Sequence, residues 1–345
     1  MQTVRCAIFN EPNQPFALSE MPFPYCGPGD VVVELLLATI CASDLHTADG
    51  RRLEPCPSIL GHEGVGKVVA VGEKRDQTLL GQRVTWTIAD SCGECVPCCD
   101  WDLPQKCSHL FKYGHSEITN GCGLNGCYAT HILLRPGTTI IPIPEHLPNE
   151  MVVPANCALA TMVGAMEYLP KPCKIAVIQG AGLLGLYGCA LLRAKGVERV
   201  IVVDHDAQRL KLVEKFGGKP ALQSAGSLLQ PGKADAVFEV AGTSAVVPEG
   251  IRLLRMGGYY AFIGMVHPTT SLELSGQIVL RHCLTIRGFH NYAPRHLHHA
   301  VKFLSEHGDK LPWDKLVSPA FPLAEINQAF AEARKRKWLR VSVKP

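Results

Sequence analysis

The hydrophobic and polar positions follow two different patterns in successive parts of the chain. Residues 1 to about 155 contain many short apolar segments broken by proline and glycine, for example residues 31–37, 65–71, 82–87 and 128–134. Repeated short strands separated by turn residues are typical of a barrel-like all-β domain. We therefore expect a strand-rich first domain.

After this region the pattern changes to strands that alternate with helices. Buried strands and helical segments follow one another at residues 174–179, from 183, and at 200–204, 208–216, 236–239, 249–254 and 259–263. This alternation predicts a doubly wound parallel sheet. We expect a strand-rich stretch around residues 278–287 to extend that sheet across the two-fold axis between two copies of the chain. Two amphipathic segments and a last strand follow, at residues 295–306, 324–336 and 339–343.

Composition and charge are those of a globular protein with no unusual partner. A chain of 345 residues is too long for one ordinary core, so two domains are expected. The net charge of +3 is not gathered into a block and predicts no nucleic-acid partner. The first residues lack the apolar stretch of a signal peptide, and no apolar run approaches the roughly 20 residues that span a bilayer. We expect a cytoplasmic protein with no membrane partner.

Five of the 15 cysteines are crowded into one short segment. In a reducing compartment such a cluster favours metal ligation over a disulfide framework. Short CxxC steps let neighbouring thiolates converge on one tetrahedral ion, and a fully closed shell of this kind is structural. We assign Cys92, Cys95, Cys98 and Cys107 as ligands, because Cys98 continues the even spacing. Cys99, which is nearer to Cys107, is the alternative third ligand.

A glycine-rich turn follows the buried strand at residues 174–179. Its glycines permit a tight turn, close approach to a pyrophosphate and close packing of helix on strand, and the helix N-terminus supplies N–H donors. The next strand ends in Asp204, where a carboxylate holds the ribose hydroxyls and repels a 2′-phosphate. Arg209 is the one nearby candidate for a 2′-phosphate, although a solvent-facing helical arginine is the better interpretation. We expect NAD to bind at Gly180, Gly182, Leu183, Leu184, Gly185 and Asp204.

Three separated segments contain further metal-ligand residue types: residues 41–46 (CASDLH), 61–64 (GHEG) and 156–161 (NCALAT). Singly each is weak, because an isolated histidine or cysteine is more often a packed core residue than a ligand. Together with the cysteine cluster and the GAGLLG turn, and in this order, they resemble the zinc-containing alcohol dehydrogenases of the medium-chain dehydrogenase/reductase superfamily. The resemblance extends over essentially the whole chain.

The resemblance implies a fold and two metal sites. A GroES-like, β-rich catalytic domain of residues 1–158 and 289–345 would enclose a Rossmann domain of residues 159–288. Zinc would be bound catalytically by Cys41, His62 and Cys157, with a fourth position open for alcohol or water, and structurally by the cysteine cluster. Two zinc ions per subunit are therefore expected.

The resemblance also implies roles for the residues around the catalytic zinc. A hydroxyl at the place of Ser43 takes the proton of the alcohol, which then passes through the cofactor ribose to a histidine at the place of His46. Histidine suits this step because its ordinary pKa, about 6.5, lies near working pH. Asp44 and Glu63 are expected to orient or tune the ligands.

Two more residues match cofactor-binding positions of these dehydrogenases. Thr161 corresponds to a position beside the nicotinamide. Arg340, in the last predicted strand, is a weaker match to a basic residue that meets the pyrophosphate, and without the resemblance it would be placed on the surface. A homodimer or homotetramer is also implied.

The expected reaction is hydride transfer between an alcohol and NAD, giving a ketone or aldehyde. Residues 103–107, 112–115, 154–158 and 289–294 look like a subgroup proposed to act in phosphonate catabolism, with some likeness to cyclic-alcohol dehydrogenases. We therefore expect a secondary, cyclic or phosphonate-type alcohol. An anionic substrate requires arginine or lysine in the cleft, but the pattern identifies none there. The alternatives are a zinc-free quinone or enal reductase of the same superfamily and a non-enzymatic protein that retains the fold.

Overall fold

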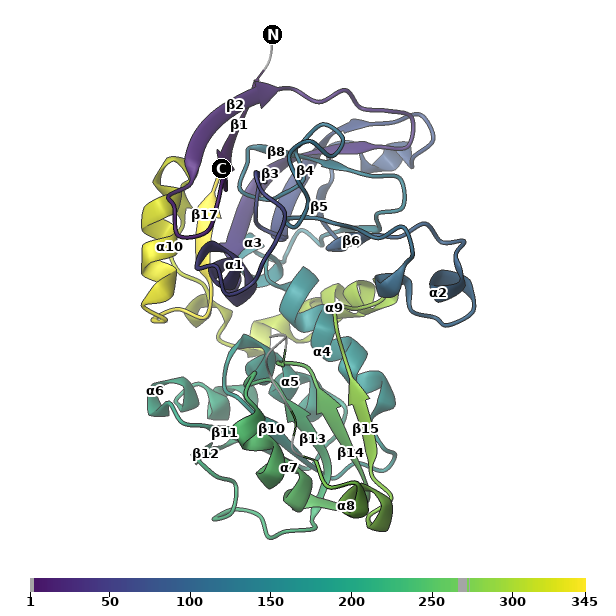
Figure 1. Cartoon of the computed structure of the whole chain (residues 1–345), viewed down its shortest axis with the longest axis vertical. Coiled ribbons are helices and arrows are strands. Elements are labelled where there is room, and N and C mark those ends of the chain that lie inside the picture. The colour runs from purple at the N-terminus through teal and green to yellow at the C-terminus, as the bar shows by residue number, and fades with distance from the viewer. Residues whose placement is uncertain (1–2, 266–271, 273) are drawn as a thin grey trace. The chain divides into compact units, whose positions relative to one another are not determined.

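The computed structural model describes residues 3–265, 272 and 274–345, which form two compact units (Figure 1). The first unit contains residues 1–157 and 293–345, and the second contains residues 158–292. No helix in the described part of the chain is long and apolar enough to cross a membrane.

A seven-stranded sheet organises the first unit. Its order is β16-β17-β3-β4-β5-β9, and β8 pairs with β3. The long strand β3 is buried along nearly its whole length because it is covered on both faces. The sheet strands are β3 (Val31–Ile40), β4 (Glu63–Val71), β5 (Arg83–Trp86), β8 (His131–Leu134), β9 (Ile140–Pro142), β16 (Phe321–Pro322) and β17 (Val341–Lys344).

Two small antiparallel sheets and several helices complete this unit. The sheets pair β1 (Thr3–Ile8) with β2 (Ala17–Pro22), and β6 (Ala89–Asp90) with β7 (Phe111–Lys112). The α-helices are α1 (Ala42–Ala48), α2 (Val96–Cys99), α3 (Asn149–Val152), α9 (Pro294–His307) and α10 (Ile326–Arg334). Single 3-10 turns lie at Gln77–Leu79, Pro104–Lys106, Gly308–Lys310, Trp313–Lys315 and Leu323–Glu325, and a π-helical turn lies at Ala155–Leu159.

The second unit is a doubly wound sheet of six parallel strands in the order β12-β11-β10-β13-β14-β15. The order reverses on either side of β10, so the carboxyl end of β10 lies at a topological switch point, where ligands of such sheets bind. The strands are β10 (Ile175–Gln179), β11 (Arg199–Asp204), β12 (Lys219–Leu222), β13 (Ala234–Glu239), β14 (Leu254–Phe262) and β15 (Thr285–Gly288). The helices are α4 (Ala160–Ala165), α5 (Leu183–Ala194), α6 (Ala207–Leu210), α7 (Val247–Leu253) and α8 (Gly276–Arg281), with 3-10 turns at Met166–Tyr168, Val213–Phe216 and Ser244–Val246.

The two architectures are those predicted, a GroES-like strand-rich domain and a Rossmann sheet, but three details differ. The stretch 278–287 is not continuous strand: α8 occupies its first part, starting with N–H groups of residues 278 and 279 bonded to the carbonyl of Ser275. The helix expected at 208–216 is two short pieces. Residues 289–292 belong to the second unit rather than the first, because the N–H of Phe289 continues the sheet by donating to Phe262 at 2.8 Å.

Candidate active site

Three residues expected to bind the catalytic metal lie together in the first unit. Cys41 follows β3 and precedes the first turn of α1, His62 directly precedes β4, and Cys157 lies in the π-helical turn. Strands β3 and β4 are antiparallel neighbours with Thr39 opposite Glu63, which brings the first two segments together. One donor atom from each of Cys41, His62, Glu63 and Cys157 lies within 4.8 Å of the other three. Two thiols and an imidazole at this distance form a donor set that suits zinc.

The thiols of Cys41 and Cys157 are joined by a hydrogen bond that shifts the pKa of each. A hydrogen bond from Cys157 holds the pKa of the Cys41 thiol well below its ordinary value, and the same contact, with burial, raises the pKa of Cys157 well above it. Cys41 is 8% exposed and His62 is 2% exposed. A buried pair in which one thiol is already stabilised as thiolate fits a divalent cation, which binds thiolate rather than thiol.

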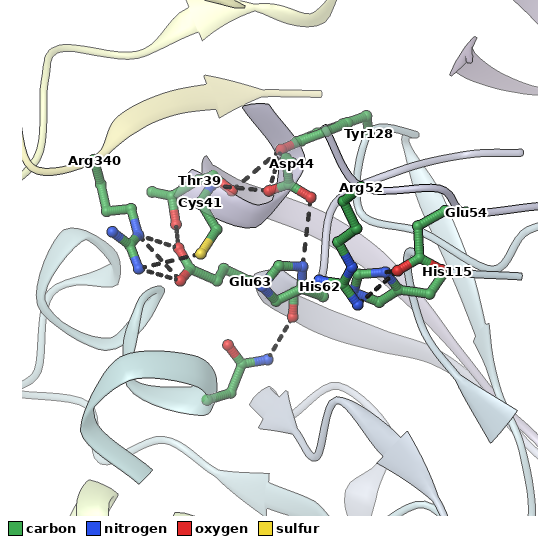
Figure 2. Close-up of polar contacts among 11 residues, drawn as sticks. Thr39, Cys41, Asp44, Arg52, Glu54, His62, Glu63, His115, Tyr128 and Arg340 are labelled. Atoms are coloured by element: carbon green, nitrogen blue, oxygen red, sulfur yellow. Dashed lines mark hydrogen bonds and ion pairs between the residues drawn. The ribbon is translucent and has the colours of Figure 1, made fainter. Parts of the chain in front are cut away.

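Asp44 contacts both Cys41 and His62 and fixes their orientation (Figure 2). Its Oδ2 accepts the backbone N–H of Cys41 at 2.8 Å and the hydroxyl of Tyr128 at 3.0 Å. Its Oδ1 lies 3.4 Å from Nδ1 of His62. Burial alone would lower the pKa of His62, but the charge and hydrogen bond of Asp44 outweigh it and raise that pKa to about 10. The carboxylate thus favours a proton on Nδ1 and leaves Nε2 for a metal ion.

Glu63 and Arg340 form a buried ion pair beside the thiols. Arg340 Nε lies 2.7 Å and 3.0 Å from the two carboxylate oxygens of Glu63, and Nη2 lies 2.8 Å from Oε1 (Figure 2). Nη2 also donates to Cys41 Sγ at 3.4 Å, and the Thr39 hydroxyl donates to Glu63 at 2.5 Å. Arg340, which the resemblance assigned to the pyrophosphate, is 6% exposed and pairs with Glu63, 277 residues away in sequence. It therefore does not lie on the surface, where the sequence without the resemblance would place it.

The cysteine cluster is brought together around α2. Sγ–Sγ distances are 3.4 Å for Cys95–Cys98, 3.7 Å for Cys95–Cys107 and 3.4 Å for Cys107–Cys92, and all four donor atoms lie within 4.8 Å of one another. Cys99 lies outside this group, with its thiol donating to the carbonyl of Gly93 at 3.1 Å. The geometry therefore supports Cys98 over Cys99 as the third ligand. A bond from the N–H of Glu94 and one from His109 lower the pKa of Cys92 to about 6, as suits a metal-binding thiolate.

The glycine turn between β10 and α5 has the geometry that a dinucleotide requires. Gly180 has φ +120°, which favours glycine, and a Cβ on Gly185 would lie 1.9 Å from the carbonyl oxygen of Gly180. Helix and strand therefore pack so closely that only glycine fits at 185. A Cβ on Gly182, at the start of α5, would meet nothing within 4 Å. Open space at a helix N-terminus is where a pyrophosphate approaches the backbone.

Of the remaining cofactor candidates, Arg340 lies in the first unit, in its ion pair with Glu63, and the others lie in the second unit. Asp204 ends β11 and is 7% exposed; its carboxylate accepts the N–H of Ala181 at 2.7 Å and that of Asp206 at 2.8 Å. Arg209 lies on α6 with Nε 3.7 Å from Asp206, its side chain 28% exposed. Thr161 lies in the first turn of α4. Leu183 and Leu184 open α5, so their N–H groups belong to the unpaired first turn.

The proton-relay candidates Ser43 and His46 both lie on α1, directly after Cys41. Residues three apart on a helix share a face. Both are partly exposed.

Sequence reasoning missed a set of side chains beside His62. The ring of His115 stacks on that of His62, with centroids 5.3 Å apart and planes inclined by 28°. His115 Nδ1 lies 3.1 Å from Glu54, whose carboxylate also pairs with Arg52 at 2.6 Å (Figure 2). The only sequence signal was the segment 112–115, noted as a subgroup likeness without any role for its residues.

Comparison with known proteins agrees with this geometry. Residues 27–145 match the model of the alcohol dehydrogenase GroES-like domain, and residues 184–306 match that of zinc-binding dehydrogenases. An alcohol dehydrogenase from Thermotoga maritima has the same fold, with a TM-score of 0.91 and 31% identity over 100% of both chains. The chain is also 27% identical to 5-exo-hydroxycamphor dehydrogenase of Pseudomonas putida, over 95% of each sequence. D-arabinitol dehydrogenase 1 of Uromyces fabae is 26% identical, over 98% of this chain and 97% of that one.

A GroES-like domain with clustered zinc-type ligands and a Rossmann domain with a dinucleotide turn define a nicotinamide-dependent, metal-binding oxidoreductase. The chain belongs to the zinc-binding alcohol dehydrogenases of the medium-chain dehydrogenase/reductase superfamily.

Proposed function

We propose that the protein is an NAD-dependent zinc alcohol dehydrogenase that interconverts a secondary, cyclic or phosphonate-type alcohol and its carbonyl product. The observation that supports this most directly is the convergence of the buried Cys41 and His62 with the partly buried Cys157 in one group. A zinc ion held there would supply Lewis-acid polarisation of the substrate oxygen. The cysteine cluster would hold a second, structural zinc ion, giving two per chain.

The residues around these ligands prepare the site for proton release. Asp44 keeps His62 in the tautomer that can bind a metal. Arg340 neutralises the buried Glu63. The Ser43 hydroxyl accepts the proton that the alcohol loses, and His46, one turn further along α1, passes it towards solvent because its ordinary pKa is near neutral.

NAD is the proposed cofactor rather than NADP. The Asp204 carboxylate at the end of β11 holds ribose hydroxyls and repels a 2′-phosphate. Arg209, the nearby cation, faces Asp206. The second unit also presents β15 at the end of its sheet order, where the sheets of two copies would pair in the expected homodimer or homotetramer.

The test combines metal analysis with one substitution. Zinc content should be two per chain, and purified protein should reduce NAD in the presence of one class among primary, cyclic, polyol and phosphonate alcohols. Cys157→Ala should abolish this turnover while NAD still binds, whereas Cys122→Ala, a half-buried thiol outside both clusters, should retain it. Turnover by Cys157→Ala would contradict the site. Metal-free reduction of quinones or enals with NADPH would instead show the zinc-free reductase, and no turnover of any alcohol by zinc-loaded protein would show a non-enzymatic one.

A further inference from the structure

Two cationic side chains lie beside the proposed metal site, and the assigned roles use neither of them. Arg52 lies in the loop that leaves α1; the N–H groups of Arg51 and Arg52 both donate to the carbonyl of His46, at 2.8 Å and 3.0 Å. Lys112 is the last residue of β7, in the turn that contains His115. Both loops are therefore anchored to segments that carry proposed catalytic residues.

The turn of Lys112 is held directly against the metal-binding segment. Gly114 has φ +71°, and a Cβ there would lie 2.5 Å from the carbonyl oxygen of Gly61, the residue before His62. Only glycine permits this approach. His115, one residue further, stacks on the His62 ring. These contacts set the position of Lys112 relative to the ligands.

Lys112 is partly buried and lacks a counterion. In the described part of the chain, no hydrogen bond or ion pair reaches its ammonium group. Burial and the charge of Arg52 lower the pKa of Lys112 to about 8, whereas Glu54, Cys157 and Cys41 act in the opposite direction.

The carboxylate of Glu54 is occupied by neighbours other than Lys112. It pairs with Arg52 at 2.6 Å. Nδ1 of His115 lies 3.1 Å from the same carboxylate, which is therefore already engaged on two sides. A partly buried cation without a partner is unfavourable, and an arriving anion would offset that cost.

We propose that Arg52 and Lys112 form an anion subsite, and that the substrate is an alcohol bearing a carboxylate, phosphate or phosphonate group a few bonds from its carbinol. This inference rests on the proposed alcohol dehydrogenase function and names its substrate class. Arg52 supplies a planar guanidinium and Lys112 a point charge, a combination that suits carboxylates and phosphorus oxyanions. A neutral alcohol leaves the ammonium group of Lys112 unpaired.

The kinetic test compares matched alcohols that differ in charge. For the zinc-loaded enzyme, kcat/KM for 3-hydroxybutyrate or 2-hydroxypropylphosphonate should exceed that for the neutral 3-hydroxybutanamide at least about tenfold, the usual scale of one charged hydrogen bond. Lys112→Met and Arg52→Gln should each lower this ratio by at least about tenfold. Lys302→Met removes a cation that is 64% exposed on α9 and should leave the ratio unchanged. Equal ratios in wild type and Lys112→Met would overturn the proposal.

A binding measurement separates this inference from the proposed function. Butyrate and methylphosphonate have no hydroxyl group to be oxidised and can be titrated calorimetrically. Both should bind to wild type and to Lys302→Met. They should bind at least about tenfold more weakly to Lys112→Met that has the same zinc content and melting temperature as wild type. The tighter of the two anions identifies the oxyanion class. Binding without turnover of any alcohol would retain the subsite and reject the dehydrogenase. Turnover of 3-hydroxybutanamide without binding of either anion would reject the subsite alone.

Discussion

Replacing Arg340 by methionine should sharply destabilise the first unit. The guanidinium makes three contacts of 2.7–3.0 Å with both oxygens of Glu63, and the two residues are 6% and 0% exposed. Arg340→Met would leave a buried carboxylate with only the Thr39 hydroxyl as a partner among these contacts. Breaking a buried pair in this way costs about 3–5 kcal/mol in the free energy of unfolding. For a unit of this size, each kcal/mol lowers the melting temperature by about 2–4 °C, so a fall of roughly 6–20 °C is expected.

The assay must follow the first unit by itself, because a chain with two cores need not unfold in one step. Hydrogen exchange of β3, β4 and β17 in the zinc-loaded protein, together with calorimetry, meets this requirement. Arg334→Met is the matched control. The Arg334–Asp49 pair is equally short, at 2.9 Å, but 45% of the Arg334 side chain is exposed. Loss of this pair should therefore lower the free energy of unfolding by less than about 1 kcal/mol. The double variant Glu63→Met/Arg340→Met should be more stable than Arg340→Met, since no buried charge is left alone. If Arg340→Met were as stable as Arg334→Met, the reasoning would be refuted.

Four further predictions concern the metal cluster and the cofactor site. Cys98→Ser should lose one of two zinc ions per chain by elemental analysis, whereas Cys99→Ser should keep both, and the reverse result would exchange the assignments. Gly182→Ala should preserve the melting temperature but weaken NAD binding in a titration, because its Cβ enters open space where the pyrophosphate approaches. Gly185→Ala should instead lower the stability of the second unit by about 1–3 kcal/mol through overpacking against Gly180, and unchanged calorimetry would contradict this. Asp204→Ser should raise the kcat/KM ratio of NADP to NAD at least about tenfold, since a like charge near the 2′-phosphate is removed; a constant ratio would place the ribose elsewhere.

Features that depend on neighbours in sequence could be predicted from the chain itself. The short apolar segment at 31–37 predicted the first part of β3, and the GAGLLG segment predicted a strand, a tight turn and a helix where β10 and α5 lie. Both patterns reflect local physics: the apolar side chains of a buried strand and the backbone freedom of glycine. Short CxxC spacing belongs to the same class, and the structure brings together the four cysteines that the spacing favoured.

Features that depend on distant partners could not be predicted in the same way. The burial of Arg340 follows from Glu63, and no pattern near residue 340 contains that information. The strand expected before residue 285 failed for another reason: the apolar run at 278–280 is too short for its periodicity to distinguish strand from helix. The positions of Arg52 and Lys112 depend on two loops meeting around His62, which the register of β3 and β4 alone does not determine.

The metal site and the anion subsite are coupled through charge. In the chain alone, the Cys41 thiolate favours the protonated form of Lys112. A zinc ion bound to both thiolates would neutralise them and remove this support, so the ammonium group would then gain more from an external anion than it does without the metal. From this balance, a zinc ion held by Cys41, His62 and Cys157 would make the Lys112 cation more dependent on the substrate's anionic group, and it would supply Lewis-acid polarisation of the substrate's hydroxyl oxygen. Anion affinity should therefore depend on metal occupancy even though neither Arg52 nor Lys112 is among the proposed metal ligands.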